Sequence, residues 1–124
     1  MNPLIIEAKD NTIPAIILDN EKGIFQISGW SHPEDATKFY TPVFEWMNRY
    51  AENPNVEMIF NFQFQYFNTS SSKQIFKLIS LLEDIAQKSK IKIHWHYSSD
   101  DTDMLSAGER FSKMSTIEFK FISH

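Results

Sequence analysis

A chain of 124 residues fits one globular domain, residues 1–124, and its 42% hydrophobic and 15% aromatic content supplies a core rich in large rings. The absence of cysteine excludes a disulfide framework and a thiolate metal site, and it favours a cytoplasmic location. A formal net charge of −4 with scattered Lys and Arg argues against a general role in nucleic-acid binding, and no apolar run approaches the ~20 residues that membrane insertion requires.

The first part of the sequence predicts three short strands. Residues 4–7 and 14–19 are rich in Ile and are separated by turn-forming polar residues. Residues 20–23 then predict a reversal into a third strand over residues 24–29. The second and third strands are therefore expected to form an antiparallel hairpin.

A helix is predicted to begin near residue 31. Ser31 and Glu34 have the spacing of a capping box, and Pro33 lies in the first turn, where its missing N–H does little harm. Pro42 interrupts the pattern, so we expect a kink or two abutting helices with Thr41 as a local cap. The apolar face consists of residues at three- and four-residue intervals: Ala36, Phe39, Tyr40, Val43, Phe44, Met47 and Tyr50.

Residues 56–67 show the clearest alternation in the chain and predict a strand with one buried and one wet face. Ile59 alone breaks the polar row. The buried face is predicted to carry Val56, Met58, Phe60, Phe62, Phe64 and Tyr66. A helical period follows as far as about Lys88, with apolar residues at Ile75, Leu78, Ile79, Leu82, Ile85 and Ala86.

The last third of the chain predicts strand, helix and strand. Residues 90–97 alternate again, with apolar residues opposed to Lys92, His94 and His96. The acidic residues 100–103 are typical of a helix start, and the apolar period of this short helix runs to Phe111. Alternating Ile and Phe at residues 117–121 then predict the last strand.

The element order β-β-β-α-β-α-β-α-β predicts an α/β fold. Alternating strands and helices imply parallel pairing with right-handed crossovers. Because the strands alternate instead of reading as continuous apolar runs, the helices should cover one face of a mixed sheet. The other face should present polar side chains: Asn61, Gln63, Gln65, Lys92, His94, His96, Glu118 and Lys120.

The junction at residues 66–73, Tyr-Phe-Asn-Thr-Ser-Ser-Ser-Lys, joins a predicted strand directly to a predicted helix. The first turn of a helix has unpaired N–H groups and a positive dipole end, so a phosphate on one of its hydroxyls would be stabilised. The simpler interpretation is that Thr69 or Ser70 is an ordinary N-cap. Spacing alone favours the cap.

Histidines and aspartates near the carboxyl ends of the later strands are candidates for chemistry. His94 and His96 point the same way on a strand and could ligate a metal, but the strand pattern also explains them as polar-face residues. Asp100, Asp101 and Asp103 could serve acid–base or Mg²⁺ chemistry, although acids at a helix start are commoner. The acidic and hydroxyl-rich loops should emerge at one edge of the sheet, where α/β proteins usually bind ligands.

Five motifs in order resemble the SiaC family of bacterial regulatory phosphoproteins. They are Gly-Trp-Ser-His-Pro-Glu at 29–34, Phe-Tyr-x-Pro at 39–42, the block at 66–73, Trp-x-Tyr at 95–97 leading to Asp-Asp-x-Asp-Met at 100–104, and Gly-Glu-x-Phe at 108–111. The Asn-Thr-Ser-Ser-Ser-Lys block is the most specific of these. The pair His94 and His96 departs from the family pattern and bears on the choice of partner.

The resemblance implies a fold like the STAS domains of anti-sigma-factor antagonists, and a protein without catalytic residues, metal or cofactor. It implies that a partner kinase phosphorylates Thr69, that a PP2C-type phosphatase removes the phosphate, and that the unphosphorylated form binds an effector. For some members this effector is a diguanylate cyclase, whose activation raises cyclic di-GMP and favours biofilm growth. Site residues on this interpretation are Thr69, a supporting loop of Asn68, Ser70, Ser71, Ser72 and Lys73, and a partner surface of Tyr66, Asp100, Asp101 and Asp103.

Two other functions remain open at this stage. One is a constitutive protein-interaction module that uses the polar sheet face and is never phosphorylated. The other is a metal-dependent enzyme that uses His94 and His96 with Asp100, Asp101 and Asp103, which would require a pocket with converging carboxylates. A nucleophile elbow and a glycine-rich phosphate loop are both absent from the sequence.

Overall fold

The computed structural model describes all 124 residues and contains six strands and three helices in the predicted order. The elements are β1 (Leu4–Ile6), β2 (Ala15–Asp19), β3 (Ile24–Ser31), α1 (Ala36–Tyr50), β4 (Glu57–Phe67), α2 (Thr69–Ile85), β5 (Lys90–Tyr97), α3 (Thr102–Lys113) and β6 (Glu118–Ser123). The α/β class and the order β-β-β-α-β-α-β-α-β are confirmed. No helix has the length and apolar character that crossing a membrane requires.

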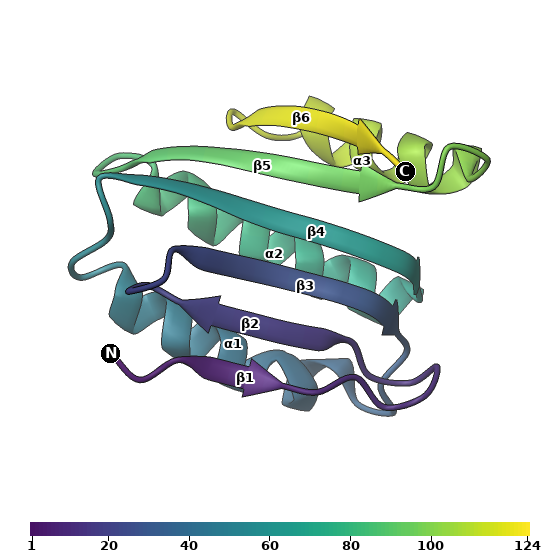
Figure 1. Cartoon of the computed structure of the whole chain (residues 1–124), viewed down its shortest axis with the longest axis horizontal. Helices are drawn as coiled ribbons and strands as arrows, with labels where there is room; N and C mark the ends of the chain where they lie inside the picture. Colours follow the sequence, from purple (N-terminus) through teal and green to yellow (C-terminus); the bar gives the residue numbers. More distant parts are fainter.

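All six strands form one sheet in chain order, β1-β2-β3-β4-β5-β6. The β1–β2 and β2–β3 pairs are antiparallel, whereas β3, β4, β5 and β6 pair in parallel. The three helices lie behind the sheet on one face (Figure 1). The prediction of a mixed sheet with helices on one side is therefore confirmed, and the carboxyl ends of β3 to β6 meet at one edge.

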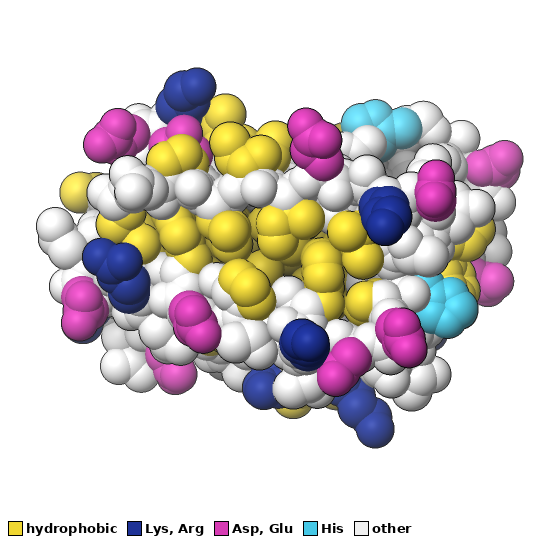
Figure 2. All heavy atoms as spheres, turned by 90° about the horizontal axis from the view of Figure 1, so that it is seen from below, with side chains coloured by type: hydrophobic (Ala, Val, Ile, Leu, Met, Phe, Trp, Pro, Cys, Tyr) yellow, Lys and Arg dark blue, Asp and Glu magenta, His cyan; other side chains and the backbone are white.

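The core lies between the sheet and the helices and is dominated by aromatic rings. Four side chains of β4 are buried: Met58, Phe60, Phe62 and Phe64. The three Phe rings contact Phe25 and Trp95 from the neighbouring strands. Seen from below, the side on which β1 and α1 lie, hydrophobic side chains form a band flanked by charged ones (Figure 2). β1 is the edge strand of the sheet on this side, and it has only three residues, which limits unwanted pairing along its free edge.

The alternation of β4 fails at both ends, and two predicted core positions are wrong. Val56 precedes the strand and is 85% exposed, because its segment turns to meet the start of β5. Tyr66 is 40% exposed because the pairing with β3 shifts: Gly29 opposes Phe64, but Trp30 opposes Tyr66. The extra residue of this bulge turns Tyr66 away from the core.

The start of α1 also differs from the prediction. Asp35 is the N-cap, and its side chain accepts a hydrogen bond from the Lys38 amide at 3.1 Å. Ser31 is instead the last residue of β3, fully buried and paired with Phe67 of β4. Sheet pairing therefore takes precedence over the capping-box spacing.

Pro42 lies inside α1, which continues as one helix to Tyr50. The expected division into two helices with a Thr41 cap is wrong, since the Thr41 hydroxyl donates to the Thr37 carbonyl within the helix at 2.8 Å. Proline removes one hydrogen-bond donor from the turn, but Pro42 and Lys38 are both exposed to water. Water can satisfy the carbonyl that the missing N–H leaves free.

Trp95 joins β5 to α3 by a close contact between its ring and the helix backbone. Its fully buried indole N–H donates to the Met104 carbonyl at 3.0 Å, and α3 passes over the ring at Gly108. A Cβ atom added at Gly108 would lie 2.5 Å from Trp95 Nε1, closer than real Cβ contacts come. The absence of a side chain at Gly108 therefore sets how closely α3 approaches the sheet.

We expect Gly108→Ala to destabilise the protein although alanine is the better helix former. Overpacking of a tight core contact costs about 1–3 kcal/mol, which exceeds the gain of about 1 kcal/mol in helix propensity. Urea unfolding would measure the loss. The exposed position Ser106 of the same helix provides the control, and Ser106→Ala should leave stability unchanged or slightly raised. An unchanged midpoint in Gly108→Ala would contradict the packing argument.

Candidate functional site

The candidate site is the junction between β4 and α2, where the helix begins with almost no loop. Asn68 is the N-cap: its side-chain oxygen accepts from the Ser71 amide at 2.9 Å, and its carbonyl accepts from the Ser72 amide at 2.9 Å. The sequence-based interpretation that Thr69 or Ser70 is the cap is wrong. Because Asn68 takes that role, the Thr69 side chain is not needed to cap the helix.

The four consecutive hydroxyl residues have different surroundings. Thr69 and Ser70 are exposed and their hydroxyls take part in no hydrogen bond, whereas Ser72 is half-buried and Ser71 is fully buried. The Ser71 hydroxyl donates to the Ser31 carbonyl at 3.1 Å and accepts from the Ser31 hydroxyl at 2.8 Å. Thr69 and Ser70 are therefore the most accessible of the four hydroxyls, and Ser71 is inaccessible to another protein.

The acidic loop lies at the same edge of the sheet. Tyr66, Asp101 and Asp103 line one cavity of about 400 Å³, together with Arg110 on α3. A smaller cavity of about 110 Å³ adjoins it, sharing Phe67, Ala107 and Arg110, and it reaches Ser72. The hydroxyl turn and the start of α3 thus border a continuous hollow surface.

The three aspartates have different roles within that surface. Asp101 is the N-cap of α3 and accepts from the Met104 amide at 3.0 Å, while Asp103 is exposed in the first turn. Asp100 is also exposed, and it lines a neighbouring polar cavity of about 310 Å³ with His96 and His124. The carboxylates therefore do not converge on a single point.

Arg110 was not identified from the sequence. It occupies the last turn of α3, is exposed, and lines both cavities of the edge. In the sequence it is one of several basic residues on a helix, with no motif around it. Lys73, which was identified, is exposed in α2 and makes no ion pair.

His94 and His96 lie on the open face of β5, as predicted, but the structure pairs His96 with a residue that the sequence did not suggest. His96 Nδ1 lies 2.8 Å from His124 Nε2, and His96 Nε2 lies 2.9 Å from Asn61 Oδ1. No group of three His, Cys, Asp or Glu side chains is placed to hold a metal ion. The direct hydrogen bond between His96 and His124 accounts for the close approach of their two rings.

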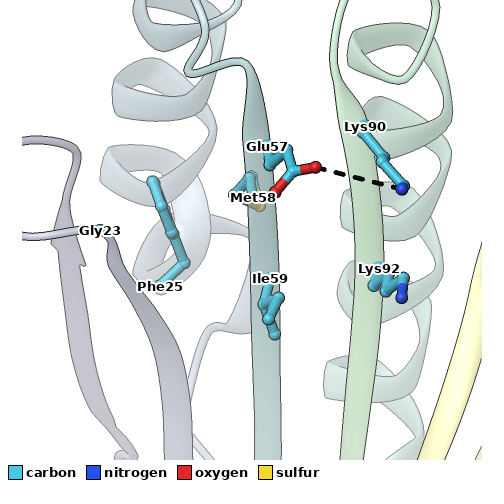
Figure 3. A pocket seen from close by; sticks show the side chains of 7 residues that line it. All are labelled: Gly23, Phe25, Glu57, Met58, Ile59, Lys90 and Lys92. Atoms are coloured by element: carbon cyan, nitrogen blue, oxygen red, sulfur yellow. Dashed lines mark ion pairs between the residues drawn. The ribbon is translucent and has the colours of Figure 1, made fainter.

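Another cavity, of about 420 Å³, lies at the opposite end of β4 from Thr69 (Figure 3). Its walls include Phe25, Met58 and Ile59, and its one carboxylate, Glu57, lies 4.0 Å from the ammonium group of Lys90. Both charged side chains are largely exposed. The cavity offers neither a nucleophile nor paired carboxylates, so it does not support a hydrolytic or metal-dependent reaction.

The family model described as SiaC family regulatory phosphoprotein matches residues 6–124. The chain belongs to this family. A curated Pseudomonas aeruginosa protein of uncharacterised function is 26% identical over 125 residues, which cover 100% of this chain and 98% of the relative. The family membership agrees with the five motifs that first suggested it.

Solved structures of the family have the same fold. SiaC of Pseudomonas aeruginosa superimposes with a TM-score of 0.88 at 25% identity, over 100% of both chains. A chain in the crystal structure of the diguanylate cyclase SiaD with its activator SiaC gives 0.89 at 25% identity, over 98% of this chain and 99% of that chain. The apo-SiaC crystal structure gives 0.87 at 26% identity, over 98% and 99%.

The histidine cluster predicts how stability depends on pH. Burial, followed by the charges of Lys120 and Lys92, lowers the pKa of His94, and burial, followed by those of His124 and His94, lowers the pKa of His96. As the pH falls through the ordinary histidine pKa of 6.5, these two histidines therefore take up protons at a higher pH in the unfolded chain than in the folded protein. The contribution of these two histidines to stability is fully present above that pH and is lost as the pH decreases.

We expect the urea midpoint to fall between about pH 7 and about pH 5, and to fall less in a His94→Gln, His96→Gln double variant. The comparison of the two pH slopes is the measurement, because substitution also changes stability at neutral pH. Parallel slopes in the variant and the unaltered protein would exclude these histidines as the source.

Proposed function

We propose that this protein is a non-enzymatic regulator controlled by reversible phosphorylation of Thr69. One observation carries the proposal: Asn68 caps α2 and Ser71 is buried, while Thr69, like its neighbour Ser70, keeps an exposed hydroxyl without a hydrogen bond, and the family resemblance selects Thr69. A kinase can reach this hydroxyl without unfolding the turn. Membership of a family of regulatory phosphoproteins supports the same modification.

A phosphate at Thr69 would change the charge of the edge without disrupting the helix. It adds about −1.5 to −2 charges at neutral pH, and negative charge is favoured in the first turn, where the N–H groups lack helical partners. The neighbouring cavity already carries Asp101 and Asp103. Arg110 lines the same cavity and offsets one of these charges, so the added phosphate makes the surface more negative overall, and a partner that fits the unmodified surface is repelled.

The unphosphorylated form is proposed to bind and activate a diguanylate cyclase and so to raise cyclic di-GMP. The support is the similar SiaC structure, in which SiaC is the activator of the cyclase SiaD. The binding surface proposed here comprises Tyr66, Asp100, Asp101 and Asp103. A cognate kinase and a PP2C-type phosphatase set the fraction of protein in each state.

Phosphopeptide mapping of the protein from its native host tests the modification. We expect one phosphate per chain at Thr69, lost after phosphatase treatment, and none in a Thr69→Ala variant expressed in the same cells. Ser71 should remain unmodified because its side chain is fully buried. Absence of phosphate under every growth condition would favour the constitutive interaction module instead.

Binding measurements test the consequence of the modification. Against a purified diguanylate cyclase from the same host, the phosphorylated protein should bind at least about tenfold more weakly than the unmodified protein, a difference of about 1.4 kcal/mol. Thr69→Ala should bind like the unmodified protein and should not respond to kinase treatment. Equal affinities of the two forms would contradict the proposed control.

Charge at the start of α3 should affect how fast the partner binds. Asp103 is exposed and caps nothing, so Asp103→Asn removes charge with little effect on the fold. We expect an association rate with the cyclase changed by about threefold and a weaker dependence on salt. Asp84→Asn, at an exposed position near the far end of α2, is the control and should behave like the unaltered protein. Identical kinetics in both variants would place the interface elsewhere.

A further inference from the structure

Three buried hydroxyl groups lie beneath the phosphorylation turn and come from three different elements. Tyr40 on α1 is 1% exposed, and Ser31 at the end of β3 and Ser71 in α2 are 0% exposed. The Ser31 and Tyr40 oxygens are 2.6 Å apart, and the Ser31 and Ser71 oxygens are 2.8 Å apart. A hydroxyl is costly to bury without partners, so such a cluster in an aromatic core needs a structural reason.

The positions of the protons follow from counting donors. Each hydroxyl has one proton, and the Ser71 proton is used on the Ser31 carbonyl at 3.1 Å. The Ser31 proton is used on the Ser71 oxygen. The remaining contact must therefore be a donation from Tyr40 to Ser31, which gives one direction to the chain: Tyr40 to Ser31, Ser31 to Ser71, and Ser71 to the backbone of β3.

Tyr40 can act as the donor throughout the physiological range. Burial raises its pKa to about 12, against a weaker opposing effect of the hydrogen bond with Ser31. The phenol therefore stays protonated. Ser31 in turn holds α2 in two ways, since its carbonyl accepts from both the Ser71 hydroxyl and the Asn68 amide, the latter at 3.1 Å.

This anchoring determines which hydroxyls face the solvent. Successive residues of a helix are rotated by about 100°, so a turn that holds Ser71 inward must direct Thr69 and Ser70 outward. A rotation of the turn by about one residue would instead expose Ser71 and turn Ser70 or Ser72 toward the core. The sequence of four hydroxyl residues cannot itself prevent that rotation, because a Ser side chain fits either environment.

We propose that Tyr40 is a positioning residue for the phosphorylation site, and that the Tyr40–Ser31–Ser71 chain withholds Ser71 from phosphorylation and keeps the turn in the orientation that exposes Thr69. The inference rests on the proposed phosphorylation of Thr69. It adds a positioning device, located on α1, to a site formed by β4 and α2.

A pair of matched variants separates positioning from stability. Tyr40→Phe removes the first donor of the chain, whereas Tyr50→Phe removes a similarly buried hydroxyl at the other end of α1, where Tyr50 accepts from the Asn55 amide at 3.0 Å. Amide hydrogen exchange at Ser71 and Ser72 should be about fivefold faster in Tyr40→Phe than in Tyr50→Phe, which corresponds to one lost hydrogen bond. Ser71→Ala provides a second variant at the other end of the chain, and Ser72 exchange should be faster there too.

Phosphopeptide mapping of the same variants completes the test. We expect phosphate at Thr69 and none at Ser71 in the unaltered protein and in Tyr50→Phe, and additional phosphate at Ser71 in Tyr40→Phe. Equal exchange in the two tyrosine variants, or faster exchange with phosphate still absent from Ser71, would overturn the positioning role. Absence of phosphate from the unaltered protein would instead overturn the proposed function, and this inference with it.

Discussion

The hydrogen bonds around Asn68 determine most of the local structure at the edge of the sheet. Its side chain caps α2 through the Ser71 amide, and its own amide is held by the Ser31 carbonyl at the end of β3. One residue thus ties two neighbouring strands to the start of a helix. Because the cap is supplied from outside the helix, the first helical residue, Thr69, is left with a free hydroxyl on a rigid turn.

The bulge between β3 and β4 makes that arrangement geometrically feasible. Without it, strict alternation would direct Tyr66 into the core and Phe67 toward solvent. The shifted register reverses both: Tyr66 contacts Trp30 at the surface, and Phe67 packs against Trp95 and Phe111. The bulge therefore supplies an exposed aromatic ring and a partly buried ring that packs on the core immediately before the cap.

The fold could be predicted because period-two strands and period-3.6 helices follow one another with little interruption. The errors arise where a long-range contact overrides a local pattern. Ser31 has the spacing of a helix cap but belongs to a strand, because its partner is Phe67 of β4. Likewise, no local signal brings His124 to His96, since the two meet only after β6 pairs with β5. A single sequence carries no record of such pairings.

The site was predicted only in part, for a related reason. Topology alone places the Thr69 turn and the Asp101 loop at one edge of the sheet, and the structure brings them to one hollow surface. The difference in accessibility among the four hydroxyls depends instead on burial, which a run of serines does not encode. Ser71 is held in the core by its hydrogen bond with Ser31, a residue 40 positions away in the chain, and its hydroxyl is therefore inaccessible.

The arrangement of polar groups also distinguishes a regulatory surface from a catalytic one. Catalysis requires groups that converge on one reacting atom, usually with pKa values shifted for the task. Here Asp101 caps α3 and Asp103 is exposed. The two histidines with lowered pKa values, His94 and His96, lie on the open face of the sheet, where His96 is hydrogen-bonded. The groups at the edge instead differ in accessibility, and accessibility is what a kinase and a binding partner detect. On the proposed function, a charge added at the exposed Thr69 would alter this surface while Asn68 continues to cap α2.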